Sequence, residues 1–169
     1  MRTLKDTELK LICELVKNSR RSDRELAKLI GVSQPTVSRI RVGLEKEGML
    51  DYTAIPNISK LGFGIMAIVF GKRDMTKHPE SHLQKAIEDT RKHPSIIFGA
   101  AGIGLGFDRI AISVHKGYTD YAKFIEDIRK EWAGLMRVES FLVDLNSEEV
   151  IQRLSFKSLV SSLIKDEQR

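Results

Sequence analysis

The sequence predicts an α+β protein, with a three-helix helix-turn-helix domain at the N-terminus followed by a ferredoxin-like βαββαβ domain. Apolar residues recur at helical spacing through residues 1–50, and strand-like apolar runs alternate with two amphipathic segments through residues 62–146. Residues 1–60 hold 12 Lys and Arg against 8 Asp and Glu, so +4 of the net charge of +5 lies there. Because basic charge favours a polyanion, we expect the helical domain to meet nucleic acid.

The composition is that of a folded intracellular protein. The chain has 169 residues, 41% of them hydrophobic, and a single Cys, so no internal disulfide is expected. The polar start of the chain does not look like a signal peptide. No apolar run approaches the roughly 20 residues of a membrane span. We therefore expect a cytoplasmic protein that does not associate with a membrane.

The first two helices of the predicted helix-turn-helix are short. The first covers residues 4–18, where Asp6 or Thr7 can cap its start; its apolar positions are Leu4, Leu9, Ile12, Cys13 and Val16. The second follows Ser22, three residues before Glu25, which is capping-box spacing, and ends at Gly31. Its expected buried side consists of Leu26, Ala27, Leu29 and Ile30.

The third helix is capped by Ser33, carries Pro35 in its first turn and ends at Gly48. Its inward side is expected to hold Val37, Ile40, Arg41 and Leu44, and its outward side Pro35, Arg39, Val42, Gly43 and Lys46. A three-residue turn separates it from the second helix, which is the spacing of a helix-turn-helix.

The N-terminal part of this third helix is the predicted reader of double-stranded DNA, because that end of a recognition helix enters the major groove. Gln34 can pair with adenine and Arg39 with guanine. The full set expected at the bases is Ser33, Gln34, Pro35, Thr36, Ser38 and Arg39. The set expected to hold phosphates is Arg20, Arg21, Arg24 and Lys46.

Residues 51–61 are predicted to be a hinge around Pro56, with room for one short strand. In the ferredoxin-like domain, strands are expected over 61–70, 95–101, 109–115 and 138–145, and helices over 79–92 and 118–132. Residues 147–169 form a C-terminal extension, expected to be helical through 150–164, although 150–156 could instead be extended.

A four-stranded sheet with two helices on one face leaves the other face bare. Since the first two strands are apolar on both faces, the second face is expected to need a cover. A second copy of the chain is the simplest one, so we predict a homodimer through the C-terminal sheet, with a higher oligomer open.

The chain resembles the Lrp/AsnC family of transcription regulators. The resemblance is carried by "RELAKLIGVS", "TVSRI", "LEKEGM" and "YTAIPN…KLGF", and it extends to the βαββαβ order. It implies a homo-oligomeric, archaeal-like, DNA-binding regulator whose second domain senses a small molecule, commonly an amino acid. In the family an Arg commonly precedes an aliphatic residue in the recognition helix, whereas here Ile40 precedes Arg41. Which Arg faces DNA therefore stays open.

The glycine-rich run 98–110 has two readings. It can be a flexible hairpin whose glycines adopt positive φ, or a loop whose bare N–H groups meet an effector carboxylate. In the second reading the effector contacts are Gly102, Gly104, Gly106 and Asp108, with Asp108 facing an effector ammonium. The glycine spacing and the strand that follows do not fit a dinucleotide site.

No catalytic pair is suggested by spacing, so we expect no enzyme and no cofactor. His78 and His82 lie four residues apart, but no third ligand is near them in the sequence, and no metal site is expected. The alternative function is a small-molecule-binding or enzymatic ferredoxin-like domain, with the helices serving as an interaction module.

Overall fold

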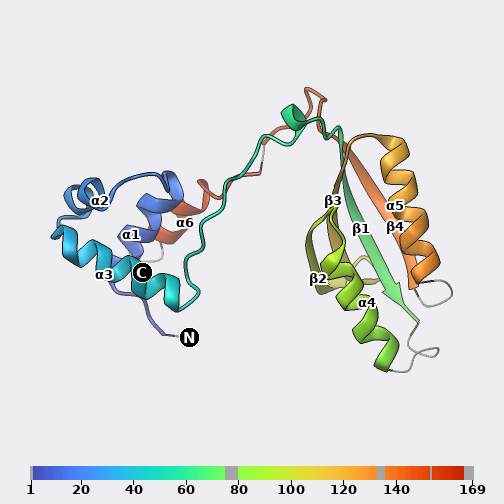
Figure 1. The fold of residues 1–169 in the computed structure, drawn as a ribbon, viewed down its shortest axis with the longest axis horizontal. Coiled ribbons are helices and arrows are strands. Elements are labelled where there is room, and N and C mark those ends of the chain that lie inside the picture. Colours follow the sequence, from blue (N-terminus) through green and yellow to red (C-terminus); the bar gives the residue numbers. More distant parts are fainter. Residues whose placement is uncertain (1, 75–79, 133–135, 153, 166–169) are drawn as a thin grey trace. The chain divides into compact units, whose positions relative to one another are not determined.

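The computed structural model describes residues 2–74, 80–132, 136–152 and 154–165, and the chain divides into two compact units (Figure 1). The helical unit consists of Met1–Ile55 together with Gln152–Arg169, and the sheet unit of Pro56–Ile151. The helical unit contains α1 (Asp6–Lys17), α2 (Asp23–Ile30), α3 (Gln34–Lys46) and α6 (Leu159–Lys165). The predicted α+β class with an N-terminal helix-turn-helix is confirmed.

Helix α1 begins and packs differently from the sequence prediction. Lys5, rather than Asp6 or Thr7, is its N-cap, and the Glu8 carboxylate accepts the Lys5 N–H at 2.8 Å. The buried side consists of Leu11, Cys13 and Leu15. Of the predicted stripe Cys13 is buried as expected, whereas Leu9 and Val16 are only half-buried. Both stripes have helical spacing, and tertiary packing selects between them.

The caps of α2 and α3 form as the sequence predicts. Ser22 Oγ accepts the Glu25 N–H at 3.3 Å, and the Glu25 carboxylate accepts the Ser22 N–H at 2.8 Å, which completes a capping box. Gly31 ends α2 with φ of 75°, a left-handed conformation that glycine adopts without steric cost. Ser33 Oγ then caps α3 by accepting the Thr36 N–H at 3.3 Å.

The core of the helical unit is a single apolar cluster from three helices. Its buried members are Leu11, Leu15, Leu26, Ala27, Val37 and Leu44, with Ile40 and others packed at the edge. Leu29, predicted to be buried, is 56% exposed, because the inward face of the short helix α2 is filled by Leu26 and Ala27.

The C-terminal extension returns to the helical unit. Its helix α6 begins only at Leu159, later than predicted, and residues 150–152 and 154–156 are irregular. Helix α6 lies beside α1 although the two are far apart in the sequence, and Val160 is 5% exposed (Figure 1).

The linker does not contain the short strand that its sequence allowed. Residues 51–58 pair with no strand, and Ser59–Leu61 forms a 3-10 turn that ends at Gly62 with φ of 87°.

The sheet unit has the predicted βαββαβ order. Its elements are β1 (Ile65–Arg73), α4 (Glu80–Lys92), β2 (Ile96–Gly104), β3 (Phe107–His115), α5 (Tyr118–Glu131) and β4 (Met136–Asp144). The strands form one antiparallel sheet in the order β2-β3-β1-β4, in which Ile68 pairs with both Ile112 and Phe141. This is the ferredoxin-like arrangement.

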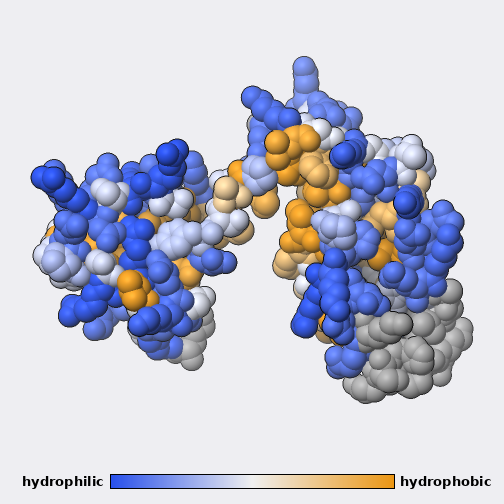
Figure 2. Space-filling view, viewed as in Figure 1, coloured by the Kyte–Doolittle hydropathy of each residue, from blue (hydrophilic) through white to orange (hydrophobic). Residues whose placement is uncertain are grey.

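The two faces of this sheet differ. Ala67, Val69 and Val138 pack in one cluster with Phe124 and Ile128 of α5, so the helices cover that face. Side chains alternate along a strand, and the alternate positions therefore lie on the opposite, uncovered face. They include Met66, Ile68 and Phe70 of β1, Ile110 and Ile112 of β3, and Phe141 of β4. A hydrophobic patch over β2 and β3 is visible in Figure 2.

Candidate nucleic-acid interface

The recognition helix α3 is anchored by its buried side, which leaves its N-terminal polar residues on the surface. Val37 and Leu44 are fully buried against the other helices. Of the residues predicted to meet bases, Thr36 is half-buried and the others are exposed: Ser33, Gln34, Pro35, Ser38 and Arg39. The helix-turn-helix geometry therefore presents this set on one surface.

Two of these hydroxyls are already engaged in shaping the helix start. Ser33 Oγ and Thr36 Oγ1 lie 2.8 Å apart, in addition to the cap bond from the Thr36 N–H. Only one of the two O–H groups is used in the Ser33–Thr36 contact, so the other can still donate to a phosphate or a base while the pair holds the first turn.

The two arginines of α3 have opposite environments. Arg41 Nη2 lies 2.7 Å from Asp23 Oδ1 and donates to the Arg21 carbonyl at 3.4 Å, and its guanidinium sits 5.9 Å from the centre of the Tyr52 ring. Arg39 is exposed and has no ion pair or hydrogen bond to the described residues. The arrangement makes Arg41 a brace between α2, α3 and the linker, and it leaves Arg39 available to a ligand.

The basic residues expected at phosphates also separate into two groups. Arg20, Arg24 and Lys46 are exposed, and none of them forms an ion pair within the described part of the chain. Arg21 is half-buried and forms an ion pair with the Glu14 carboxylate while also donating to the Glu14 carbonyl. Its guanidinium is therefore committed to α1.

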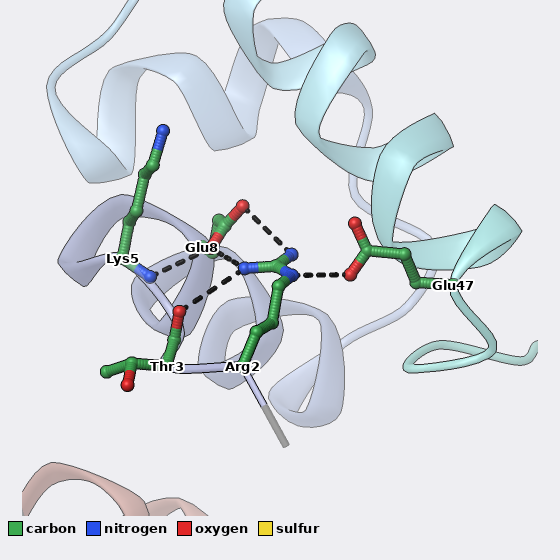
Figure 3. Close-up of polar contacts among 5 residues, drawn as sticks. All are labelled: Arg2, Thr3, Lys5, Glu8 and Glu47. Atoms are coloured by element: carbon green, nitrogen blue, oxygen red, sulfur yellow. Dashed lines mark hydrogen bonds and ion pairs between the residues drawn. The ribbon is translucent and has the colours of Figure 1, made fainter.

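The far end of α3 is held by an arginine from the N-terminal arm (Figure 3). Arg2 Nε lies 2.6 Å from Glu47 Oε2, next to the end of α3, and Arg2 Nη1 lies 2.9 Å from Glu8 Oε2 at the start of α1. The Arg2 hydrogen bond lowers the pKa of Glu8, and its two carboxylate partners raise the pKa of Arg2. Helix α3 is thus tied to neighbouring elements at Arg41 and at its C-terminal end, which fixes the helix that carries the exposed polar set.

The surface of the helical unit is predominantly hydrophilic (Figure 2). Within the described ranges no helix is long and apolar enough to cross a membrane. The same ranges contain no cluster of three metal-ligating side chains. His78 lies outside the described residues.

Residues 4–41 match the model of the AsnC-type helix-turn-helix domain. A curated relative, an uncharacterised HTH-type transcriptional regulator of Pyrococcus furiosus, is 29% identical over 154 residues, which are 89% of this chain and all of that protein. The chain thus contains an AsnC-type helix-turn-helix domain, and its predicted resemblance to the Lrp/AsnC transcription regulators is confirmed. It is accordingly a regulator rather than an enzyme, and the Pyrococcus relative agrees with the archaeal-like character of the resemblance.

Solved structures show that the Lrp/AsnC fold extends over nearly the whole chain. A Neisseria meningitidis regulator, solved as an L-Met complex, superposes with a TM-score of 0.77 at 20% identity and covers 91% of this chain and 96% of its own. LrpC of B. subtilis superposes with a TM-score of 0.67 at 23% identity, over 89% of this chain and 100% of its own. At these identities the two likenesses establish the fold.

The predicted effector residues fall partly in strands. Gly102 and Gly104 belong to β2, and the turn consists of Leu105 and Gly106, with φ of 51° and 79°. The expectation that several glycines supply positive φ is therefore wrong for Gly102 and Gly104. A two-residue turn needs positive φ only at its two central positions, and Leu105 occupies the first.

Asp108 is surrounded by cations. Its carboxylate lies 3.8 Å from Lys72 Nζ, 3.9 Å from Arg73 Nε and 4.0 Å from Arg109 Nη1. These three cations already balance the negative charge of the Asp108 carboxylate, which weakens its attraction for an effector ammonium.

Sequence reasoning missed two features of the DNA-facing unit. Lys28 is exposed on α2 and is a further candidate for a phosphate contact. The Asp23–Arg41 pair was also missed, although Asp23 follows a helix cap and Arg41 lies on the predicted inward side of α3. An acidic residue at the start of one helix and an inward-facing arginine on the next are the signal that could have revealed it.

Proposed function

We propose that the chain reads duplex DNA as a homodimer, with the N-terminal part of α3 in the major groove and Arg39 as its principal base contact. The observation that carries this proposal is the contrast between the two arginines of α3: Arg41 is held by Asp23, and Arg39 is exposed without a partner among the described residues. An unpaired guanidinium can make the two-point contact that guanine offers. Such a reader of DNA would act in the cytoplasm.

The phosphate contacts come from Arg20, Arg24 and Lys46, which position the protein without reading sequence. We leave Arg21 out of this set, because its guanidinium is engaged by Glu14. Two recognition helices related by a two-fold axis would read half-sites one or two helical turns apart.

The dimer forms through the uncovered sheet face. Phe141 is 62% exposed there in a single copy, and it pairs across the sheet with Ile68, whose other neighbour is Ile112. Exposed apolar area of this kind favours association. The family and the continuous apolar face together support a second copy of the chain as the cover, and higher assembly is compatible with it.

An amino acid is the effector class that the relatives favour, since the N. meningitidis structure is a complex with L-Met. The β2–β3 turn, with Gly104 and Gly106 beside Asp108, is the proposed contact region in this chain. Fluorescence anisotropy of labelled DNA, measured with and without each amino acid, tests this part of the proposal.

The main experiment selects bound duplexes from a random pool and then measures the affinity of the Arg39→Ala variant. We expect a loss of roughly 1–3 kcal/mol on the selected site and little loss on unrelated DNA. Arg129→Ala, at an exposed arginine of α5, is the matched control and should bind like the parent. Equal affinity of Arg39→Ala and the parent for every duplex would contradict the assignment of Arg39.

A further inference from the structure

The sheet unit contains a cavity that none of the functions described above uses. It has a volume of about 490 Å³ and lies between α4, α5 and the helix-covered face of the sheet. That volume is within the range of small-molecule sites. None of the candidate effector residues Gly102, Gly104, Gly106 and Asp108 lines it.

The cavity exists because of the small residues of β2. Gly99 and Ala101 line it and pair with Ala111 and Arg109 on the helix-covered face, where larger side chains would fill the space beneath α4. A Cβ on Gly99 would have no neighbour closer than the Ile110 carbonyl oxygen at 4.0 Å. The backbone at Gly99 therefore leaves room for a side chain that the sequence does not provide.

The walls are apolar and the charged groups at the cavity have one sign. The apolar wall includes Val69, Ile87, Ile96, Ile128, Trp132 and Met136. Arg91 from the last turn of α4 and Arg109 from β3 are the charged lining residues, and none of the described lining residues is acidic. An apolar body with a single negative group matches this lining, because a guanidinium binds a carboxylate through paired N–H donors.

Arg109 has N–H donors that are unpaired among the described residues. Its Nη1 donates to the Asp108 carbonyl at 2.7 Å and lies 4.0 Å from the Asp108 carboxylate, and no other partner is found among the described residues. The Nε and Nη2 edge is thus left for a ligand. An α-ammonium on that ligand would find no carboxylate among the described residues of the cavity wall, and leaving it unpaired there would cost affinity.

We propose that this cavity binds a small apolar monocarboxylate that lacks an α-amino group, with Arg109 holding its carboxylate. The site is separate from the β2–β3 turn proposed for an amino-acid effector, and it selects against amino acids. It gives the sheet unit a second, chemically distinct ligand.

Trp132 lines the cavity and is the only Trp of the chain, so its fluorescence reports on binding. The full chain is titrated, without DNA, with two matched pairs: 4-methylpentanoate against leucine, and 3-phenylpropanoate against phenylalanine. Within each pair the compounds differ only by the amino group. We expect a saturable change with each acid and affinity weaker by roughly tenfold or more for its amino acid.

Two variants locate the site. Arg109→Gln should weaken acid binding by roughly tenfold or more, whereas Arg129→Gln, at an exposed position of α5, should not change it. Gly99→Val should fill the cavity and abolish the fluorescence change while the chain stays folded, as judged by circular dichroism. If Gly99→Val fails to fold, Ala101→Val is the second filling variant, with the same expected result.

The proposal is overturned if neither acid gives a saturable change with the folded parent chain. It is equally overturned if leucine and phenylalanine bind as well as their acids, or if the Arg109 and filling variants bind like the parent. Because DNA is absent from this experiment, its failure would leave the proposed reading of DNA by α3 untouched.

Discussion

The two units of this chain differ in how completely a single copy buries their apolar surface. The helical unit encloses its core from within one chain, with all six residues of its buried cluster at 8% exposure or less. The sheet unit covers only one face, and on the other Phe98 and Phe141 are 52% and 62% exposed. A helix has one apolar stripe to bury, whereas a strand that is apolar on both faces needs two covers. The helical unit, which reads DNA, thus buries its apolar core within one copy, whereas the sheet unit leaves an apolar face exposed.

The sharpest way to break this comparison is to place a charge on the open sheet face. Phe141→Asp should convert the proposed dimer to a monomer, because each copy would lose an aromatic ring from the interface and would bury a carboxylate instead. Loss of two phenylalanines costs roughly 3–6 kcal/mol of association free energy at about 1.5–3 kcal/mol each. Light scattering coupled to gel filtration measures the mass.

Leu29→Asp is the control for that change. Leu29 is 56% exposed on α2, a similar degree of exposure to Phe141, but it belongs to the unit whose core is already closed. The Leu29→Asp protein should remain a dimer. If Phe141→Asp also stayed dimeric, the open face would not be the interface.

The second prediction tests how the helical unit closes itself. In Arg41→Ala, Asp23 loses its 2.7 Å partner at a half-buried site, which should cost roughly 1–2 kcal/mol of stability. Amide hydrogen exchange in α2 and α3 measures the loss within this unit. Arg39→Ala should change exchange by less than about 0.5 kcal/mol, since its side chain is exposed. If the amides of α2 and α3 were equally protected from exchange in Arg41→Ala and Arg39→Ala, the bracing role of Arg41 would be contradicted.

The sequence could predict the features that depend on residues near one another in the chain. Caps are local, so Ser22, Gly31 and Ser33 were assigned correctly from a few neighbouring residues. The order of strands and helices was also predictable from periodicity.

Selection between two apolar stripes is not local. Leu11 and Leu15 are buried instead of Leu9 and Val16 because of where α2 and α3 pack, which spacing within α1 cannot reveal. Similarly, the cations around Asp108 include Lys72 and Arg73 from another strand, so that site depends on sheet register.

The third prediction concerns the covered face of the sheet unit, where His115 is fully buried. Its Nε2 lies 2.9 Å from Ser113 Oγ, and its ring contacts Tyr121 and Phe124. Burial lowers the pKa of His115; nearby Asp120, with Oδ2 3.8 Å from Nδ1, opposes the shift, and His93 adds to it. In the unfolded chain this histidine takes up a proton near its ordinary pKa of about 6.5, before the folded form does.

Stability of the sheet unit should therefore fall as the pH drops below about 6.5, by up to roughly 1.4 kcal/mol per pH unit. Urea unfolding followed by Trp132 fluorescence at a series of pH values from 7.5 to 5.5 measures this slope. His115→Gln should flatten the slope, and His93→Gln should retain most of it. A parent protein with a flat profile would show that His115 titrates alike in both states.

The smallest expected effect isolates a single cap in the helical unit. Ser22 Oγ accepts the Glu25 N–H. The Ser22 O–H also donates to the Glu25 carboxylate at 2.7 Å, and this bond together with the one from the Ser22 N–H lowers the pKa of Glu25. Ser22→Ala should destabilise α2 by about 1 kcal/mol and move the pKa of Glu25 back toward its ordinary value. Amide exchange and an NMR titration of Glu25 measure the two effects.

Ser38→Ala is the matched control, since Ser38 is exposed on α3 and has no hydrogen bond to the described residues. It should leave both readouts unchanged. If Ser22→Ala weakened α2 without moving the pKa of Glu25, the capping box would contribute through the serine alone. If neither readout moved, α2 would owe its start to packing by Leu26 and Ala27, and the helical unit would depend on its core more than on its caps.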